Sequence, residues 1–150
     1  MRKELLEEAA REALVGIKNK DGGPFGAIIT DKDGNIVGRG HNMVIANNDP
    51  TAHAEVMAIR DACNKLKTHD LSDYYIYSSC EPCPMCLSAI VWSNIKVLYY
   101  GASRIDADRI GFRDKLIYDY FNNDNCILSK DEIEVDLCKK ILDEYKGEMY

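Results

Sequence analysis

The stretch that most constrains the fold runs from residue 73 to residue 101, where two β-rich runs flank a helical run. The three runs read DYYIYSS, PMCLSAIVWS and IKVLYYG, and the helical one opens with a proline, which suits the first turn of a helix. Two strands joined by a helix pair in parallel through a right-handed crossover. The sequence therefore predicts a β-α-β unit and, with it, an α/β protein.

The rest of the chain adds elements to this unit. Apolar residues at helical spacing predict a first helix over residues 5–17, and FGAIIT and NIVGRGHN around the turn DKDG predict a hairpin over residues 25–42. A second helix is expected after NNDPT, and a terminal helix over residues 129–145, opened by a capping box from Ser129 to Glu132. We expect a three-layer α/β/α sandwich with a central mixed sheet of about five strands, built as one domain spanning residues 1–150.

Composition and charge narrow the classes of partner. The chain has 46% apolar and 29% charged residues, as an ordinary globular protein does, and its formal net charge is −6. Nucleic-acid binding relies on clustered Lys and Arg, so this charge disfavours a nucleic-acid partner. The acidic amphipathic start and the lack of a long apolar run argue against export and against a membrane span. We therefore expect a cytoplasmic protein.

Three of the six cysteines lie close together in SSCEPCPMC, at Cys80, Cys83 and Cys86. In the reducing cytosol such a cluster is more often a metal site than a set of disulfides. Cys83 and Cys86 are three residues apart at the predicted start of a helix, where the helix dipole favours the thiolate that binds zinc. Cys80 falls at the end of the preceding strand, and we expect its thiol to pack against other side chains instead of binding metal.

A second short motif, HAE, supplies His53 and Glu55 at the start of the second predicted helix. Residues two apart point to different sides of a regular helix, so both can face one site only where the chain enters the helix, as Pro50 suggests. One His and two Cys make three zinc ligands, which leaves the fourth tetrahedral position open to water. Glu55 beside that position, but off the metal, is placed to carry a proton.

Together, HAE and EPCPMC match the H-x-E and P-C-x-x-C signature of the zinc nucleobase deaminases, and the chain is similar to that superfamily. Within it, GGPFGA, NDPTAHAE, SCEPCPMCL, DADRIGFRDKLIY and the last residue, Tyr150, resemble the small bacterial guanine deaminases, over most of the chain. The resemblance implies a cytidine deaminase-like fold, one Zn²⁺ per chain and a purine base as substrate, guanine being converted to xanthine and ammonia.

The resemblance also implies roles for individual residues. The metal ligands would be His53, Cys83 and Cys86, with Glu55 as the proton shuttle and Asp114 near the amine that leaves. The substrate pocket would contain the following residues: Phe25, Asn42, Ala54, Trp92 and Tyr150. Taken without the resemblance, Phe25 and Trp92 fit equally well as core aromatics, Asn42 as a turn residue and Asp114 as a helix cap.

The assembly is a further implication of the resemblance. It suggests a homodimer in which the protomers exchange their C-terminal segments. Tyr150 would then close a substrate site, either in its own chain or in the partner subunit. Residues 122–136 depart from the family because they look short and acidic. The placement of the tail depends on that segment.

Three other functions compete with guanine deamination. A tRNA adenosine deaminase has the same zinc motif, but this chain lacks a basic tail. A deaminase of guanosine or of another small aminated ring is barely separable by sequence. A structural zinc module, with Cys80 as a fourth ligand, would leave Glu55 without a role. The remaining cysteines, Cys63, Cys126 and Cys138, are expected in the core, and His41 and His69 are left unassigned.

Overall fold

The computed structural model describes all residues from 1 to 150. The chain divides into two compact units, Met1–Asp114 and Lys115–Tyr150. The first unit contains α1 (Arg2–Asn19), β1 (Gly26–Thr30), β2 (Ile36–His41), α2 (Val44–Asn47), α3 (Ala54–Leu66), β3 (Tyr75–Cys80), α4 (Pro84–Trp92), β4 (Val97–Ala102) and α5 (Arg104–Arg109). The second contains α6 (Lys115–Phe121) and α7 (Asp136–Glu144).

The first unit is built on a four-stranded sheet with the order β2-β1-β3-β4. β1 pairs antiparallel with both β2 and β3, whereas β3 and β4 pair in parallel on either side of α4. The predicted hairpin and the predicted β-α-β unit are therefore confirmed. The expectation of about five strands is wrong by one, because Ser103 and Asp106 form a capping box directly after β4 and turn the chain into α5.

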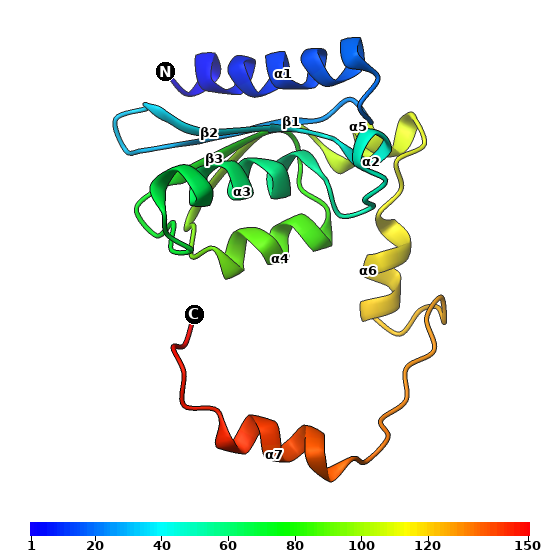
Figure 1. Ribbon diagram of the computed structural model, residues 1–150. Helices are drawn as coiled ribbons and strands as arrows, with labels where there is room; N and C mark the ends of the chain where they lie inside the picture. Colours follow the sequence, from blue (N-terminus) through cyan, green and yellow to red (C-terminus); the bar gives the residue numbers. More distant parts are fainter. The chain divides into compact units, whose positions relative to one another are not determined.

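Helices cover the sheet on both faces, α1 on one side and α3 with α4 on the other (Figure 1). Strand β1 is buried along its whole length and divides its side chains between the two layers. Ala27 and Ile29 pack in the core beneath α3 and α4, while Ile28 packs with Leu5 and Ala9 of α1. This alternation follows from the two-residue period of a strand, and it gives the predicted α/β/α sandwich.

Helix α3 lies unusually close to the hairpin because β2 contains glycine where the two elements meet. A Cβ atom built on Gly40 would lie 2.4 Å from the backbone nitrogen of Ala58, and one built on Gly38 would lie 2.7 Å from the Cβ of Ala62. Any larger side chain would push the helix away from the sheet. The start of α3 is thereby held against the sheet, and it is this end that carries HAE.

The second unit consists of α6, α7 and the segments around them, and none of its residues is buried. The predicted terminal helix begins at Asp136, seven residues after the predicted capping residue Ser129. The Ser129–Glu132 capping box is therefore wrong. Residues 129–135 include β-branched Ile133 and Val135, which favour extended backbone, and Val135 is extended at the helix entry.

The short helix α2 follows the hairpin and was not predicted. It has only four residues, because the backbone enters the left-handed region at Asn48, and a single turn is too short to leave a periodic pattern in the sequence. Among the helices, none has the combination of length and apolarity that a membrane span requires.

Candidate metal centre and active site

Two helix N-termini meet at the centre of the candidate site. His53 is the N-cap residue of α3 and Cys83 is the N-cap residue of α4, both with extended backbone. An N-cap side chain usually accepts a hydrogen bond from its own helix, but neither of these does. Both side chains are instead turned toward each other. The position of His53 just outside α3 allows it and Glu55, two residues apart, to face one site.

The imidazole of His53 lies between two sulfurs. Its Nδ1 is 3.5 Å from the Sγ of Cys83 and 3.5 Å from the Sγ of Cys86. In a tetrahedral zinc site with the usual bond lengths, neighbouring N and S ligands are about 3.6 Å apart and two S ligands about 3.8 Å. All three donor atoms lie within 4.8 Å of one another, so their spacing fits a zinc ion and leaves one coordination position outside the protein.

The pKa shifts of these three residues are also consistent with a site for a cation. Hydrogen bonds from Cys86 and His53 lower the pKa of Cys83 to about 4. The hydrogen bond to Cys83 raises the pKa of Cys86, and it also raises the pKa of His53. These pKa shifts show that the three side chains interact and that the thiolate form is favoured at Cys83. A divalent cation would remove the remaining protons, because zinc binds thiolate and neutral imidazole.

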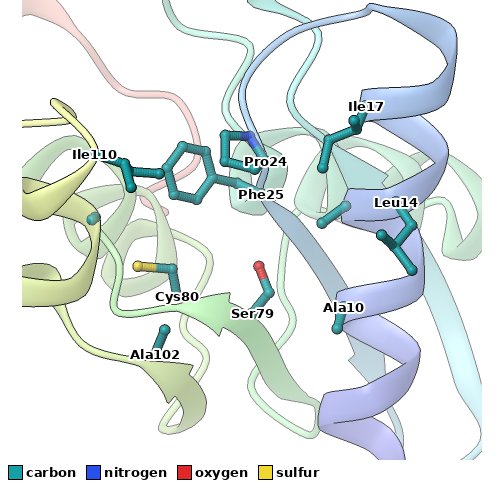
Figure 2. Close-up of a pocket in the computed structure, with 11 residues that line it drawn as sticks. Ala10, Leu14, Ile17, Pro24, Phe25, Ser79, Cys80, Ala102 and Ile110 are labelled. Atoms are coloured by element: carbon teal, nitrogen blue, oxygen red, sulfur yellow. The ribbon is translucent and has the colours of Figure 1, made fainter.

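Cys80 is not part of this cluster. Its Sγ lies 3.6 Å from the carbonyl oxygen of Ser103, and burial raises the pKa of its thiol to about 11. Cys80 lines a cavity of about 350 Å³. In Figure 2 it lies among the side chains that surround this cavity, with Phe25 and Ile110 nearby. The lining of this cavity is mainly apolar, including Leu14 and Ile110. A protonated thiol in such surroundings acts as a small apolar group.

Glu55 lies in the first turn of α3 with only 6% of its surface exposed. It is not one of the clustered donors, and its Oε1 accepts a hydrogen bond of 3.1 Å from the hydroxyl of Ser78. Burial raises the pKa of Glu55, which brings the carboxyl group closer to the range in which it can both accept and give up a proton. A buried carboxylate beside three metal donors is an uncommon arrangement in a purely structural site.

The hairpin and the segment before it bring Phe25 and Asn42 together. The backbone N–H of Asn42 donates to the carbonyl of Phe25 at 3.1 Å, and the Oδ1 of Asn42 accepts from the N–H of Val44 at 3.0 Å. Asn42 is 5% exposed. Gly22 makes room for its amide, since a Cβ there would lie 2.1 Å from Oδ1. Ala54, the third pocket residue expected in this unit, is fully buried at the start of α3, next to His53.

Asp114 is the last residue of the first unit and directly precedes α6. Partial burial raises the pKa of its carboxyl group, an effect that the positive charge of Arg104 opposes. The charge of Cys83 also acts on Asp114 and raises its pKa further. The role of Asp114 near the leaving amine stays a prediction.

The two remaining expected pocket residues are placed differently. Trp92 is the last residue of α4 and 66% exposed, whereas Cys83 precedes the first residue of that helix. A nine-residue helix spans roughly 12 Å between its first and last residues, which argues against a role for Trp92 in the site of its own chain. Tyr150 belongs to the second unit and is 77% exposed. The roles expected for Trp92 and Tyr150 in the pocket stay predictions.

Sequence reasoning missed two residues that touch the site. Ser78 donates to Glu55, and Phe112 packs edge to face against Phe25 with ring centroids 5.0 Å apart. A hydroxyl within the buried run YIYSSC was the available signal for Ser78, because a buried polar group needs a partner. No periodicity pointed to Phe112, since it lies in an irregular segment.

Comparison with known proteins places these observations in context. Residues 1–102 match the model of the cytidine and deoxycytidylate deaminase zinc-binding region. The chain is 51% identical over 113 residues to the guanine deaminase of Bacillus subtilis, an alignment that covers 75% of this chain and 72% of that one. It is 41% identical over 100 residues to the tRNA-specific adenosine deaminase of Haemophilus influenzae, covering 67% of this chain and 58% of the relative.

The solved structures agree with the sequence comparison. The crystal structure of the Bacillus subtilis guanine deaminase superimposes with a TM-score of 0.90 and 38% identity, covering 99% of this chain and 98% of that one. The similarity in fold therefore extends beyond the residues that match the family model, into the segment after residue 102.

Proposed function

This chain belongs to the cytidine and deoxycytidylate deaminase family, and on that premise we propose that it is a zinc-dependent guanine deaminase, which hydrolyses guanine to xanthine and ammonia. The observation that carries the proposal is the position of a buried carboxylate, Glu55, beside three donors with the spacing of a zinc site. The choice of guanine is supported by the 51% identical relative, which is a guanine deaminase.

The proposed metal site holds one zinc ion per chain through His53 Nδ1, Cys83 Sγ and Cys86 Sγ. When bound, zinc supplies Lewis-acid chemistry that lowers the pKa of a water ligand to about 7. The two helix N-termini at which the ligands lie support the thiolates electrostatically. Cys80, with its pKa of about 11, stays protonated and outside the ligand set.

Glu55 is the proposed proton carrier. Its carboxylate accepts the first proton that water loses as oxygen attacks C2 of guanine, and it delivers that proton to ring nitrogen N3. It then carries the second proton to the amino group on C2, so that the C–N bond breaks and ammonia leaves. Burial keeps bulk water away from this carboxylate and raises its pKa, which suits both halves of the transfer.

The base is held, in this proposal, by side chains of the first unit. Asn42 offers a buried amide for the polar edge of the purine, Phe25 offers an aromatic ring for its face, and Ala54 borders the pocket at the start of α3. Asp114 assists the departure of the amine. A pocket of this kind selects its ligand because a base without matching hydrogen-bonding groups leaves buried polar atoms unpaired.

We also propose that the protein is a homodimer in which the C-terminal segment is exchanged between chains. Support comes from the second unit, in which no residue is buried in the single chain and many apolar side chains are exposed, among them Leu137, Ile141 and Leu142. Exposed apolar side chains along one helix are typical of a surface that a second chain covers. In such a dimer Trp92 and Tyr150 complete the site of the partner subunit.

The decisive test measures ammonia release from a panel of compounds by the zinc-loaded protein. The panel contains guanine, guanosine, adenine, adenosine, cytosine, cytidine and an RNA hairpin with adenosine in its loop. We expect the highest kcat/KM for guanine. The RNA hairpin is included because a tRNA-specific adenosine deaminase is 41% identical to this chain. A higher kcat/KM for the hairpin than for guanine would replace the proposed function with RNA editing. No ammonia from any compound would leave only the structural zinc module.

A further inference from the structure

Ser78 lies at the centre of the sheet, where its hydroxyl reaches the carboxylate of Glu55. It pairs with Ala27 of β1 on one side and with Tyr100 of β4 on the other. Its side chain is almost fully buried, with 2% of its surface exposed, and its Oγ donates to Glu55 Oε1 at 3.1 Å. The contact joins residues 23 positions apart in the sequence, so it exists only because α3 packs on this face of the sheet.

The sheet position determines where this hydroxyl points. Successive side chains of a strand alternate between faces, so Ser78 shares a face with Ile76, which packs in the core beneath α3 and α4. Tyr77 packs on the opposite face, with α1. Ser78 is thus a polar group in an otherwise apolar layer. A buried hydroxyl there costs free energy unless it is hydrogen-bonded, and the partner it has is the carboxylate of Glu55.

The hydrogen bond joins the carboxylate of Glu55 to a neutral hydroxyl and not to a cationic side chain. A hydroxyl donor holds a carboxylate oxygen in place without cancelling its charge, whereas an Arg or Lys would pair with it and hold it ionised. The terminal torsion of a glutamate is broad when nothing fixes it. A hydrogen bond to one oxygen fixes the plane of the group, and catalytic groups need such support to keep a productive geometry.

We propose that Ser78 is a positioning residue for deamination, which holds the carboxylate of Glu55 in the orientation that proton transfer requires. This inference rests on the proposed function, because it assigns Ser78 to the proton carrier of that reaction. Ser78 is not one of the three clustered donors, and its hydroxyl is hydrogen-bonded to the proton carrier, Glu55. Its removal lowers the rate of the chemical step and leaves binding intact.

Ser93 provides a matched control. It is also a buried serine, 5% exposed, and its hydroxyl donates to the carbonyl of Ile90 at 2.7 Å, at the far end of α4. Replacing either serine with alanine removes one buried hydroxyl and its hydrogen bond. The two variants therefore share the structural cost, and only Ser78→Ala loses the contact with Glu55.

The experiment compares Ser78→Ala, Ser78→Thr and Ser93→Ala with wild type. For each protein we measure zinc content, melting temperature, kcat and KM for guanine, and the Kd of xanthine by calorimetry. In Ser78→Ala we expect kcat to fall about 10- to 100-fold, with full zinc content and with KM and Kd within about 2-fold of wild type. In Ser78→Thr, which keeps the hydroxyl, kcat recovers to within about 3-fold, and Ser93→Ala keeps the wild-type kcat.

A double variant identifies the route of the effect. In a Glu55→Gln background, Ser78→Ala lowers kcat no further if Ser78 acts through Glu55, since residues that act as a unit are not additive. Equal kcat in Ser78→Ala and Ser93→Ala would overturn the inference while leaving the proposed function standing, as would a full additional loss in the double variant. A wild-type protein that deaminates no base would overturn both.

Discussion

The helices α1 and α7 carry similar patterns of apolar residues and have opposite fates. In α1, Leu5, Ala9, Ala13 and Gly16 are buried against the sheet. Helix α7 separates its apolar and polar residues onto different faces more clearly than α1 does. None of its residues is buried, however, and Leu137, Ile141 and Leu142 are 59% or more exposed. An apolar stripe predicts that a helix forms and which face needs cover. It does not say what provides the cover.

The same contrast separates the two units as a whole. The first unit has a core on each face of its sheet, and it contains the three clustered candidate donors together with Glu55. The second unit has no buried residue of its own. A unit without a core cannot hold reacting groups in fixed positions, whereas the first unit positions His53, Cys83 and Cys86 by the starts of two packed helices.

The largest expected effect tests whether the first unit alone supplies the metal ligands. Cys83→Ser or Cys86→Ser should abolish turnover and lower the zinc content to near zero, because each removes a thiolate from a three-ligand site. Cys80→Ser should keep one zinc per chain and most of the activity. Zinc content and guanine kinetics, measured on the same preparations, test this prediction. Zinc loss in Cys80→Ser would mean four protein ligands and no position for water, and the proposed function would fall.

The next effect in size concerns the proton carrier. Glu55→Gln should reduce kcat roughly 10³-fold while leaving the zinc content unchanged, since Glu55 is close to the metal donors without being one of them. Zinc analysis and guanine kinetics on the same preparation provide the measurement. A metal-free Glu55→Gln protein would make Glu55 a ligand and contradict the assigned role.

A smaller effect is expected at the boundary between the units, where Asp114 lies. Asp114→Ala should lower kcat/KM for guanine about 10- to 100-fold, because the pocket loses a group near the departing amine. Glu144→Ala, a surface carboxylate of α7, serves as the matched control and should have no effect on kcat/KM. Should Asp114→Ala merely melt at lower temperature with normal kinetics, Asp114 is a helix cap.

The smallest effects, on stability, address the comparison of α1 with α7 directly. Leu5→Ala should cost about 3 kcal/mol at any protein concentration, because Leu5 packs in the core of its own chain. Ile141→Asp should instead convert a dimer to a monomer, since Ile141 can be covered only from outside the first chain if the segment is exchanged. Light scattering and thermal melts at two concentrations distinguish the two. An unchanged mass in Ile141→Asp would contradict the exchanged dimer.

Much of the first unit could be predicted from local patterns. The hairpin follows from DKDG between two β-rich runs, and α4 begins at Pro84 as its proline indicates. The clustering of His53, Cys83 and Cys86 could also be predicted, since residue type and spacing select these three residues. These features depend on residues close together in the sequence, whose geometry a short segment largely determines.

Two predictions were wrong although they concern local features. The predicted strand count and the predicted start of α7 failed because the capping box of Ser103 and Asp106 turns the chain into α5 directly after β4, and because the backbone at Val135 is extended. Other features depend on where distant parts of the chain lie. Trp92 lies at the far end of α4 from Cys83, a separation that a list of family residues does not express.

By itself, the sequence selected the candidate groups: three candidate metal donors, one candidate proton carrier and the short segments that become helices and strands. Only the tertiary structure decided which of these groups lie together. The hydroxyl of Ser78 reaches Glu55 because glycines in β2 let α3 approach the sheet, and Cys80 is turned toward Ser103, away from the metal donors. Such distinctions arise from packing, because a side chain's surroundings in the fold come from residues far away in the sequence.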